Sequence, residues 1–485
     1  MTRDVPTRCR AVLLAIFIAF GFLFGYDIGV ISGCLIMPDF IRQFGQEGTN
    51  GQYYLSSSRQ SIIVSVLSAG GAIVQAFTSD RLGRRGSILF WSAIFTVGVA
   101  IQTSTTYSLV QLLMGRYIAG LGAGSLSGCV FLSYVIELGS HTINNSASWR
   151  LPIGLQMVWG IIILSGMFFL PESPRHLLGT GRSDEARKVI AELNGVPEDD
   201  PIVIGIVKEL DFAIKAENEG GKATWLECFS TRNALWRRTM NGIMLQFIQQ
   251  LNGQNFYYFY GDTFFQSAGA GLSPYIIQTI LGAVSLFGTL PALYFIETWG
   301  RRKSLLLGAS AQAVCALIVA VVGHTTLAPT GTPTSALTGR NRAGGNIVIT
   351  FAVFQVFIFN TTWGPTAWVY LGESFPLRVR PKSIAFGTAS SMIAPFSLFE
   401  FVLSMFEHLA RIGPMIMLVF FSMLVFGYIY VYFAIPETKG LTLEEVDEMY
   451  RSGIPPWRSV GWRPSEKHYH PEVHEKQASD SVENC

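Results

Sequence analysis

An acidic residue, Asp27, stands inside a long apolar stretch that begins at Ala11 and contains GFLFGYDIGV. A carboxylate near the middle of a membrane costs about 2.5–3.5 kcal/mol on insertion scales, so it normally faces a cavity or an opposite charge. Arg116, in MGRYIAG, is embedded in another apolar stretch and can supply that charge. When the two groups separate, desolvation disfavours the ionised carboxylate, which then binds a proton. The pair predicts a proton-coupling site, unless Asp27 lies near enough to the surface to be hydrated.

A second group of polar residues is crowded into the apolar segment QFIQQLNGQNFYYFYG. It contains Gln249, Gln250 and, one and a half turns further on, Asn255. Amides both donate and accept hydrogen bonds, which suits a small polar ligand, and nearby aromatic rings suit an apolar face of such a ligand. So many amides cannot face lipid. They indicate either a site for a polar ligand or hydrogen bonds between neighbouring helices.

The composition fits a membrane protein. Of the 485 residues, 49% are hydrophobic and only 14% are charged, against about a quarter in soluble domains. The net charge of +2 and the absence of a basic stripe argue against a nucleic-acid partner. The six cysteines are scattered, and no nucleophile–base set, metal cluster or phosphate loop stands out. We therefore expect neither an enzyme, nor a metal site, nor a cofactor.

Membrane spans of about 20 apolar residues must position these groups. Eleven can be read: Ala11–Met37, Ser61–Thr78, Ser87–Thr103, Ser108–Leu138, Leu151–Leu170, Thr239–Phe265, Pro274–Ile296, Ser304–Gly323, Asn346–Leu371, Ile384–Phe406 and Pro414–Ile435. The positively charged loops should all be cytoplasmic. If the chain crosses the membrane once with each of the eleven spans, the loop at 79–86 lies on the cytoplasmic side but the loop at 297–303 lies on the opposite side. The parity predicts that one crossing is absent between Leu138 and Leu151.

An internal repeat supports the same conclusion. DRLGRRG (Asp80–Gly86) recurs as ETWGRRK (Glu297–Lys303), and PESPR recurs as PETKG. In the first half 34 residues separate Glu137 from Pro171, whereas 63 separate Glu373 from Pro436 in the second. The first half is short by about one helix and its loop. Two similar halves are typical of secondary transporters.

The chain resembles the sugar porters of the major facilitator superfamily, in particular fungal high-affinity glucose transporters. The matching motifs follow in order from about residue 11 to 450: FGYDIGVISG, DRLGRRG, GRYIAGLGAG, PESPRHLL, QQLNGQNFYYFY, ETWGRRK, TTWGPTAWVYLGESFPLRVR and PETKGLTLEEVDE. The resemblance implies an all-α polytopic fold with two pseudo-symmetric six-helix bundles, of which 11 spans are readable here where the family has 12. It also implies a sugar site between the bundles and alternating access.

The resemblance assigns roles to further residues. It places sugar-contacting amides at Gln249, Gln250 and Asn255, an aromatic ring beside the sugar at Trp368, and supporting contacts at Asn360 and Phe24. Family members with an aspartate at the position of Asp27 are proton symporters, while uniporters tend to carry asparagine there. Breaks at Gly253 and at Gly364–Pro365 would line the cavity.

Several positions depart from the family pattern. The fifth family span, with its sugar-binding glutamine, is missing. Leu132 stands where the family has proline, and Ser285 replaces an asparagine that often faces the sugar. TASSMIAPF (Thr388–Phe396) replaces a segment with Asn-Trp, and Glu400 follows inside the same apolar run. We expect these changes to weaken sugar binding.

The charged loops suggest an ionic latch that holds the bundles together in the outward-facing state and breaks on inward opening. Charges that merely orient the chain in the membrane are the alternative. The latch residues implied by the family match are Asp80, Arg84, Arg85, Glu137, Glu297, Arg301, Arg302, Glu373 and Arg380.

The combined prediction is transport of a hexose, with glucose and proton symport favoured; a non-transporting glucose sensor and a truncated inactive isoform are the alternatives. The partners are a sugar, protons and the lipid bilayer, and we expect a monomer in the plasma membrane. The predicted parts are a cytoplasmic N-terminus (1–10), an incomplete N-terminal bundle (11–170), a cytoplasmic helical linker (171–238), a C-terminal bundle (239–435) and a cytoplasmic, partly disordered tail (436–485).

Overall fold

The structure is a computed structural model that describes residues 30–31, 33–47, 52–72, 75–106, 108–123, 131–218, 224–267, 273–327, 338–376, 378–408 and 415–463. The side chains of 68–84, 122–131 and 395–408 are not among those described. Asp27 and Phe24 lie outside the described residues, as does most of the predicted first span.

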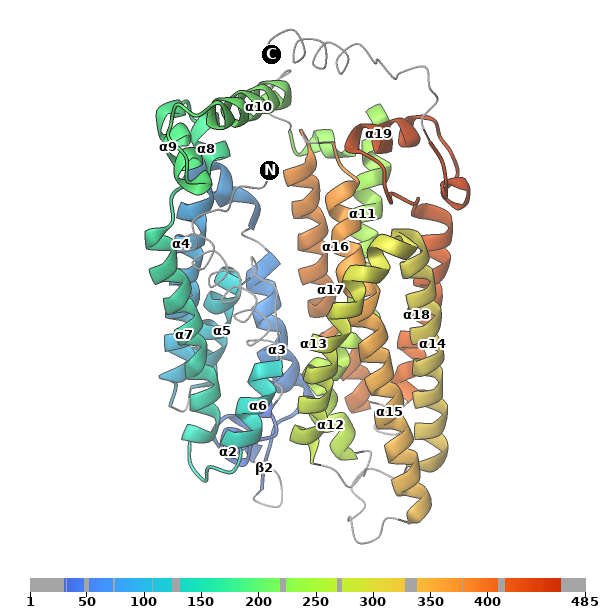
Figure 1. Ribbon diagram of the computed structural model, residues 1–485. Coiled ribbons are helices and arrows are strands. Elements are labelled where there is room, and N and C mark those ends of the chain that lie inside the picture. Colours follow the sequence, from blue (N-terminus) through green and yellow to red (C-terminus); the bar gives the residue numbers. More distant parts are fainter. Residues whose placement is uncertain are drawn as a thin grey trace.

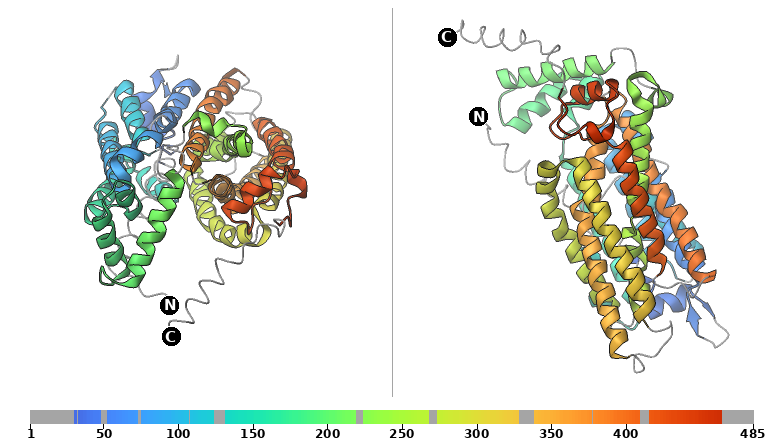
Figure 2. Two further views of the ribbon diagram at one scale, coloured as in Figure 1. Left: turned by 90° about the horizontal axis from the view of Figure 1, so that it is seen from above. Right: turned by 90° about the vertical axis from the view of Figure 1, so that its right-hand side faces the viewer.

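Long helices in two groups make up most of the molecule. Figure 1 shows α2–α7 side by side in one half and α11–α18 in the other, and the view from above in Figure 2 separates the same two groups. Their bounds are α2 Pro38–Phe44, α3 Ser57–Ala72, α4 Gln75–Thr103, α5 Leu109–Ala123, α6 Phe131–Ser140 and α7 Ala147–Phe169 in the first half, and α11 Leu235–Gln250, α12 Gln254–Ser267, α13 Pro274–Trp299, α14 Arg301–Thr326, α15 Gly339–Thr361, α16 Trp363–Glu373, α17 Arg380–His408 and α18 Ile416–Ala434 in the second.

Short helices cover the upper end of both halves in Figure 1, where the arginine-rich loops also lie. They are α8 Pro174–Gly179, α9 Ser183–Asn194, α10 Pro201–Asn218, α19 Leu443–Arg451, and the 3₁₀ turns at Leu226–Phe229, Arg232–Ala234 and Pro456–Arg458. Helices α8 and α9 share a small apolar core around Leu177, Leu178 and Val189. At the lower end, Gln46–Glu47 and Tyr53–Tyr54 form a two-stranded antiparallel ribbon (β1 and β2).

Packing within each half is more extensive than packing between the halves. In the first half α4 packs on α5 and α7, and in the second α14 packs on α15 and α18 while α11 packs on α17. The halves meet where α3 packs on α17 and α6 on α13. Six helical segments in the described ranges are long and apolar enough to cross a membrane: Arg85–Thr103, Ala147–Phe169, Pro274–Trp299, Arg301–Thr326, Gly339–Glu373 and Ile416–Ala434.

Two of the predicted spans are interrupted where the sequence has helix breakers. Between α11 and α12 the chain turns at Gly253, whose φ of 84° is left-handed and whose hydrogen faces the ring of Phe420. Between α15 and α16 it turns at Thr362, with φ −120° and ψ −79°. Pro365 then falls in the first turn of α16, where a missing N–H costs no intrahelical hydrogen bond. The predicted breaks in these two spans are confirmed.

The predicted span Ser108–Leu138 is divided into two helices, α5 and α6. Arg150, at the start of α7, donates to the carbonyl of Thr105 at 2.7 Å, so the chain just before α5 lies at the same end as the beginning of α7. Only six residues join α6 to α7. The chain between Ser108 and Ser140 therefore leaves this end and returns to it. The reversal lies within the predicted span, earlier than the stretch between Leu138 and Leu151 where we expected the missing crossing.

Candidate functional site

The side chain of Gln249 connects the two helix breaks. It is 3% exposed, and its Nε2 donates to the carbonyls of Trp363 (3.1 Å) and Gly364 (2.8 Å). A carbonyl in the first turn of a helix keeps a second lone pair beyond its helical hydrogen bond, and a buried amide can donate to it. Its Oε1 is buried and accepts no hydrogen bond from the described residues. Gln249 therefore holds the breaks together and offers one acceptor to a ligand hydroxyl.

Gln250 and Asn255 form a pair across the break at Gly253. Asn255 Nδ2 donates to Gln250 Oε1 at 2.5 Å, and both side chains are half-buried. This bond leaves the Nε2 of Gln250 as a donor and the Oδ1 of Asn255 as an acceptor. A donor and an acceptor fixed side by side match adjacent hydroxyls of a sugar ring.

Asn360 belongs to a closed hydrogen-bonded triangle with Ser285 and Tyr258. Ser285 Oγ donates to Asn360 Oδ1 at 3.1 Å, the hydroxyls of Tyr258 and Ser285 are 2.8 Å apart, and Asn360 Nδ2 donates to the Tyr258 hydroxyl at 3.3 Å. Tyr134 of α6 in turn donates to the carbonyl of Tyr258 at 3.2 Å. Sequence analysis missed Tyr258; its signal was the aromatic run NFYYFYG that follows the amides.

Trp368 differs from its neighbours on α16. It is 39% exposed, whereas Trp363, Ala367 and Tyr370 are fully buried. Trp363 donates its indole N–H to the carbonyl of Leu305 at 2.9 Å and so has a packing role. Trp368 is thus the tryptophan of this helix with a face left for a ligand.

Only one member of the predicted proton-coupling pair lies in the described residues. Arg116 is fully buried in α5, and its Nε donates to the carbonyl of Ile63 at 2.6 Å. Glu137 of α6 is 1% exposed and lies against Gly33, where its carboxylate occupies the space that a Cβ would need. The first half therefore carries a buried guanidinium and a buried carboxylate.

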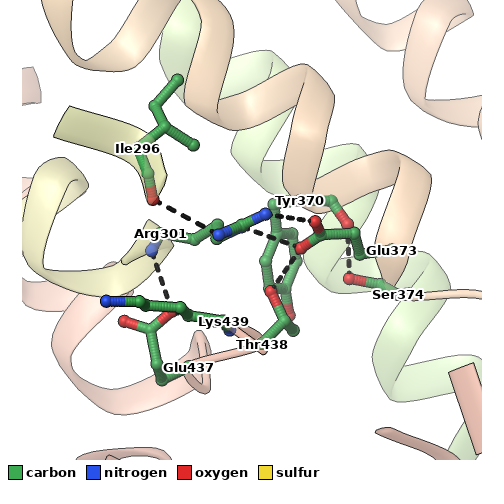
Figure 3. Close-up of polar contacts among 8 residues, drawn as sticks. All are labelled: Ile296, Arg301, Tyr370, Glu373, Ser374, Glu437, Thr438 and Lys439. Carbon is green, nitrogen blue, oxygen red and sulfur yellow. Dashed lines mark hydrogen bonds and ion pairs between the residues drawn. The ribbon is translucent and has the colours of Figure 1, made fainter. Parts of the chain in front are cut away.

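A cluster of charges joins three segments at the upper end of the second half (Figure 3). Arg301 forms a bidentate pair with Glu373, Nη2 to Oε1 at 2.5 Å and Nε to Oε2 at 2.9 Å, and Thr438 donates to the same carboxylate at 2.8 Å. Glu437 accepts the backbone N–H groups of Arg301 at 2.8 Å and Arg302 at 3.2 Å. The α13–α14 turn, the end of α16 and the segment after α18 are thereby tied together.

The first half repeats part of this arrangement at the residues of the sequence repeat, although sequence analysis did not anticipate Glu172 or Glu437 as partners. The backbone N–H of Arg85 donates to Glu172 at 3.2 Å, as that of Arg302 does to Glu437. The Arg85 guanidinium also donates to the carbonyls of Met167 and Phe168 at the end of α7, both at 3.0 Å. These contacts join segments of one half. They brace each half internally, whereas the latch was expected to join the two halves.

The remaining latch residues are placed differently. Glu137 lies on α6 against Gly33, whereas Arg85 contacts Glu172 where α7 leads into α8, so Glu137 is not part of that contact. Glu297 is exposed and forms no ion pair within the described part of the chain. The guanidinium of Arg380 lies beside Gly372, near the end of α16. The side chains of Asp80 and Arg84 are outside those described.

Sequence analysis did not anticipate a buried network that docks α19. Arg238 is 1% exposed on its side chain, pairs with Asp447 at 2.9 Å, and lies over the ring of Tyr450 at 4.4 Å. The hydroxyls of Tyr450 and Tyr370 are 2.6 Å apart, which ties α19 to α16, and burial raises the pKa of the Tyr450 phenol. The signal was LTLEEVDE, in which Thr442 and Glu445 form a capping box that starts the helix.

Two halves of related sequence, with broken helices whose breaks are held by buried amides, define a secondary transporter of the membrane. Comparisons identify the family. The model of the family "Sugar (and other) transporter" matches residues 12–132 and 125–450. The chain belongs to this family, the sugar porters of the major facilitator superfamily, and is a multi-pass membrane protein that transports sugar.

Similar proteins include two yeast transporters. The chain is 38% identical to the low-affinity glucose transporter of Kluyveromyces lactis, over 94% of this chain and 85% of that protein. It is 36% identical to the low-affinity glucose transporter HXT3 of Saccharomyces cerevisiae, over 93% and 84%. Among solved structures, the proton:xylose symporter XylE has the same fold, with a TM-score of 0.70 and 20% identity over 91% of this chain and 98% of that one.

Proposed function

We propose that this protein carries a hexose, with glucose as the favoured substrate, across the plasma membrane together with a proton by alternating access. The observation that carries the sugar assignment is the set of three amide side chains beside the two helix breaks. Gln249, Gln250 and Asn255 offer donors and acceptors in a fixed arrangement beside backbone that is already interrupted. Such breaks line substrate sites in transporters. The printed names of the yeast relatives support glucose as the substrate.

In the proposed site each residue has a separate task. Gln250 and Asn255 bind adjacent hydroxyls, and Gln249 accepts a third while it holds the α15–α16 break. Trp368 supplies the ring for the apolar face of the sugar, and Phe24 keeps the supporting role that the family assigns to it. Asn360 contributes through its triangle with Ser285 and Tyr258.

Proton coupling rests on Asp27 and Arg116. A fully buried guanidinium favours the ionised form of a carboxylate that approaches it, so Arg116 can lower the proton affinity of such an acid. Asp27 is the carboxylate that the apolar sequence places at membrane depth in the first span. In the cycle, separation of the pair lets Asp27 take up a proton from outside, and renewed contact with Arg116 releases it inside.

The latch residues contribute by bracing the cytoplasmic ends of the helices within each half. Arg301–Glu373 and Arg85–Glu172 make each end a rigid unit, so the halves can rock as bodies. A second candidate function is a glucose sensor or an inactive isoform. The observation that favours it is the change of direction between α5 and α6. Helix α6 has 10 residues, whereas a complete membrane span needs about 20.

The test is uptake of labelled glucose in cells stripped of their own hexose carriers, with surface expression measured in parallel. We expect uptake against a gradient that collapses with a protonophore. Asp27→Asn should abolish accumulation but leave protonophore-insensitive equilibration, while Asp39→Asn, which changes a partly exposed carboxylate nearby, should behave as the unmodified chain. Accumulation by Asp27→Asn would exclude the coupling role.

The sugar site is tested in the same cells. Asn255→Ala should raise the KM for glucose about tenfold, because a sugar hydroxyl loses the Asn255 acceptor and Gln250 loses the side chain that holds it in place. Asn346→Ala, an exposed asparagine on α15, is the control and should leave the KM unchanged. Surface-expressed protein that binds labelled glucose but moves none would favour the sensor, and protein that does neither would favour the inactive isoform.

A further inference from the structure

An apolar groove opens on the outer surface of the second half, between α13, α14 and α15. It has a volume of about 460 Å³ and is lined almost entirely by apolar atoms. The lining includes Phe295 and Trp299 of α13, Leu307, Ser310 and Val314 of α14, and Phe357 of α15. This volume lies within the range of roughly 300–1,000 Å³ that holds small molecules. Because the surrounding surface faces the bilayer, the available occupant is a lipid chain.

The groove is close to the end of the helices that carries the arginine-rich turns. Trp299 is the last residue of α13 and is 40% exposed, and its ring packs on Phe295 at 4.2 Å between centroids. Tryptophan concentrates where a membrane meets water. The rim of the groove therefore lies at the level of the lipid headgroups, on the side that the positively charged loops assign to the cytoplasm.

A lysine stands above the groove on the same helix face. Lys303, Leu307, Ser310 and Val314 follow one another at intervals of three or four residues, which places them in one stripe along α14. Lys303 is exposed and forms no ion pair within the described residues. The nearby cation Arg301 is already engaged by Glu373, and Lys439 donates to the carbonyl of Thr298 at 2.6 Å.

The charges around the rim favour an anion. Glu297, the exposed carboxylate of this turn, is two residues from both Phe295 and Trp299 and so projects from the opposite side of α13. Two lysines therefore belong to this end of the groove: Lys303, in the groove-lining stripe of α14, and Lys439, which bonds to the backbone next to Trp299. The cytoplasmic leaflet is where anionic phospholipids are concentrated, and each lysine near its surface contributes to their attraction.

From this geometry we infer that the α13–α14–α15 groove is a binding site for one anionic phospholipid. One acyl chain lies in the groove between Phe295, Leu307 and Val314, and the headgroup phosphate contacts Lys303. The site is separate from the sugar-binding amides, and its occupancy does not depend on transport. A neutral sterol, which would need no cation, is the competing occupant.

The test is native mass spectrometry of the purified full-length protein titrated with phosphatidylserine or phosphatidylcholine of the same chain length. The unmodified protein should retain phosphatidylserine in preference. Lys303→Gln should weaken phosphatidylserine binding about fivefold, the ratio expected for one lysine near an anionic headgroup, and leave phosphatidylcholine unaffected. Lys208→Gln, an exposed lysine on α10, is the matched control and should change neither.

A second variant tests the groove itself. Ser310→Phe adds a ring at a groove-lining, exposed position and should reduce retention of both phospholipids. Ala311→Leu serves the same purpose if Ser310→Phe does not give monodisperse protein. The inference is overturned if Lys303→Gln binds phosphatidylserine as tightly as the unmodified protein does. It is also overturned if Lys208→Gln weakens phosphatidylserine binding as much as Lys303→Gln does. Retention of ergosterol that Ser310→Phe abolishes and Lys303→Gln does not change would also overturn it, in favour of a sterol.

Discussion

Removing the charge of Glu373 tests whether the cluster in Figure 3 braces the cytoplasmic end of the second half. The Arg301 and Glu373 side chains are 13% and 30% exposed, so their pair is neither a surface pair, worth about 0.2–1 kcal/mol, nor fully buried, where breaking it costs about 3–5 kcal/mol. In Glu373→Gln either orientation of the amide sets an N–H against a guanidinium N–H, because both carboxylate oxygens accept from Arg301. We expect a loss of about 2 kcal/mol of local stability.

Hydrogen exchange measures this loss directly. The backbone N–H groups of Arg301, Arg302 and Lys439 all donate to Glu437 and are released when the cluster opens. A loss of about 2 kcal/mol corresponds to exchange roughly 30-fold faster in peptides that contain these amides. Glu297→Gln is the control, since it removes a carboxylate from the same turn that forms no ion pair within the described residues.

A double variant decides whether the effect belongs to the pair. Arg301→Gln combined with Glu373→Gln should cost little more than either change alone, which gives a coupling energy of about 1–2 kcal/mol. Exchange in Glu373→Gln within twofold of the unmodified protein would refute the reasoning. So would an equal acceleration by Glu297→Gln, because the cluster would then respond to net charge and not to this contact.

Two further predictions concern the same end of the molecule. Gly300→Ala should lower the free energy of unfolding, measured by thermal denaturation, by about 1–3 kcal/mol, because φ is 89° and the new Cβ would lie 2.5 Å from an oxygen of Glu437. Gly440→Ala, at φ 69° with open space around it, should lower it less, and equal losses would contradict the steric argument. Asp447→Asn should lower the free energy of unfolding by about 3 kcal/mol, because the buried Arg238 loses its counter-charge. Arg451→Gln removes the 58%-exposed partner of the same carboxylate and should lower it by less than about 1 kcal/mol, and similar unfolding temperatures for the two variants would count against a structural role for the buried pair.

Much of the fold could be predicted from local sequence. Hydropathy located the helices, because a membrane span needs a long apolar run, and Gly253 and Gly364–Pro365 marked the breaks, because these residues cannot continue a helix without loss. The repeat of DRLGRRG and PESPR as ETWGRRK and PETKG predicted two similar halves. The structure adds that Arg85–Glu172 and Arg302–Glu437 match in their backbone hydrogen bonds.

The direction of the chain at α5–α6 was not predictable in this way. An apolar run from Ser108 to Leu138 is long enough for one span, and hydropathy does not distinguish one crossing from two shorter legs. Only the position of Arg150 beside Thr105 shows that the chain returns to the end from which it started. Glu137 is carried with it to the lower end, which is why a residue assigned to the cytoplasmic latch lies against Gly33.

The candidate site shows the same division. Residue types alone identified Gln249, Gln250 and Asn255, because amides are unusual in an apolar segment and need partners there. Which partners they have depends on distant segments: Gln249 bonds to the α15–α16 break more than a hundred residues away, and Tyr258 joins Ser285 and Asn360 from two other helices. By itself the sequence determined the helices, their breaks and the chemistry that they carry. Only the tertiary structure decided which of these groups meet, because contacts between helices depend on how they pack and not on their spacing along the chain.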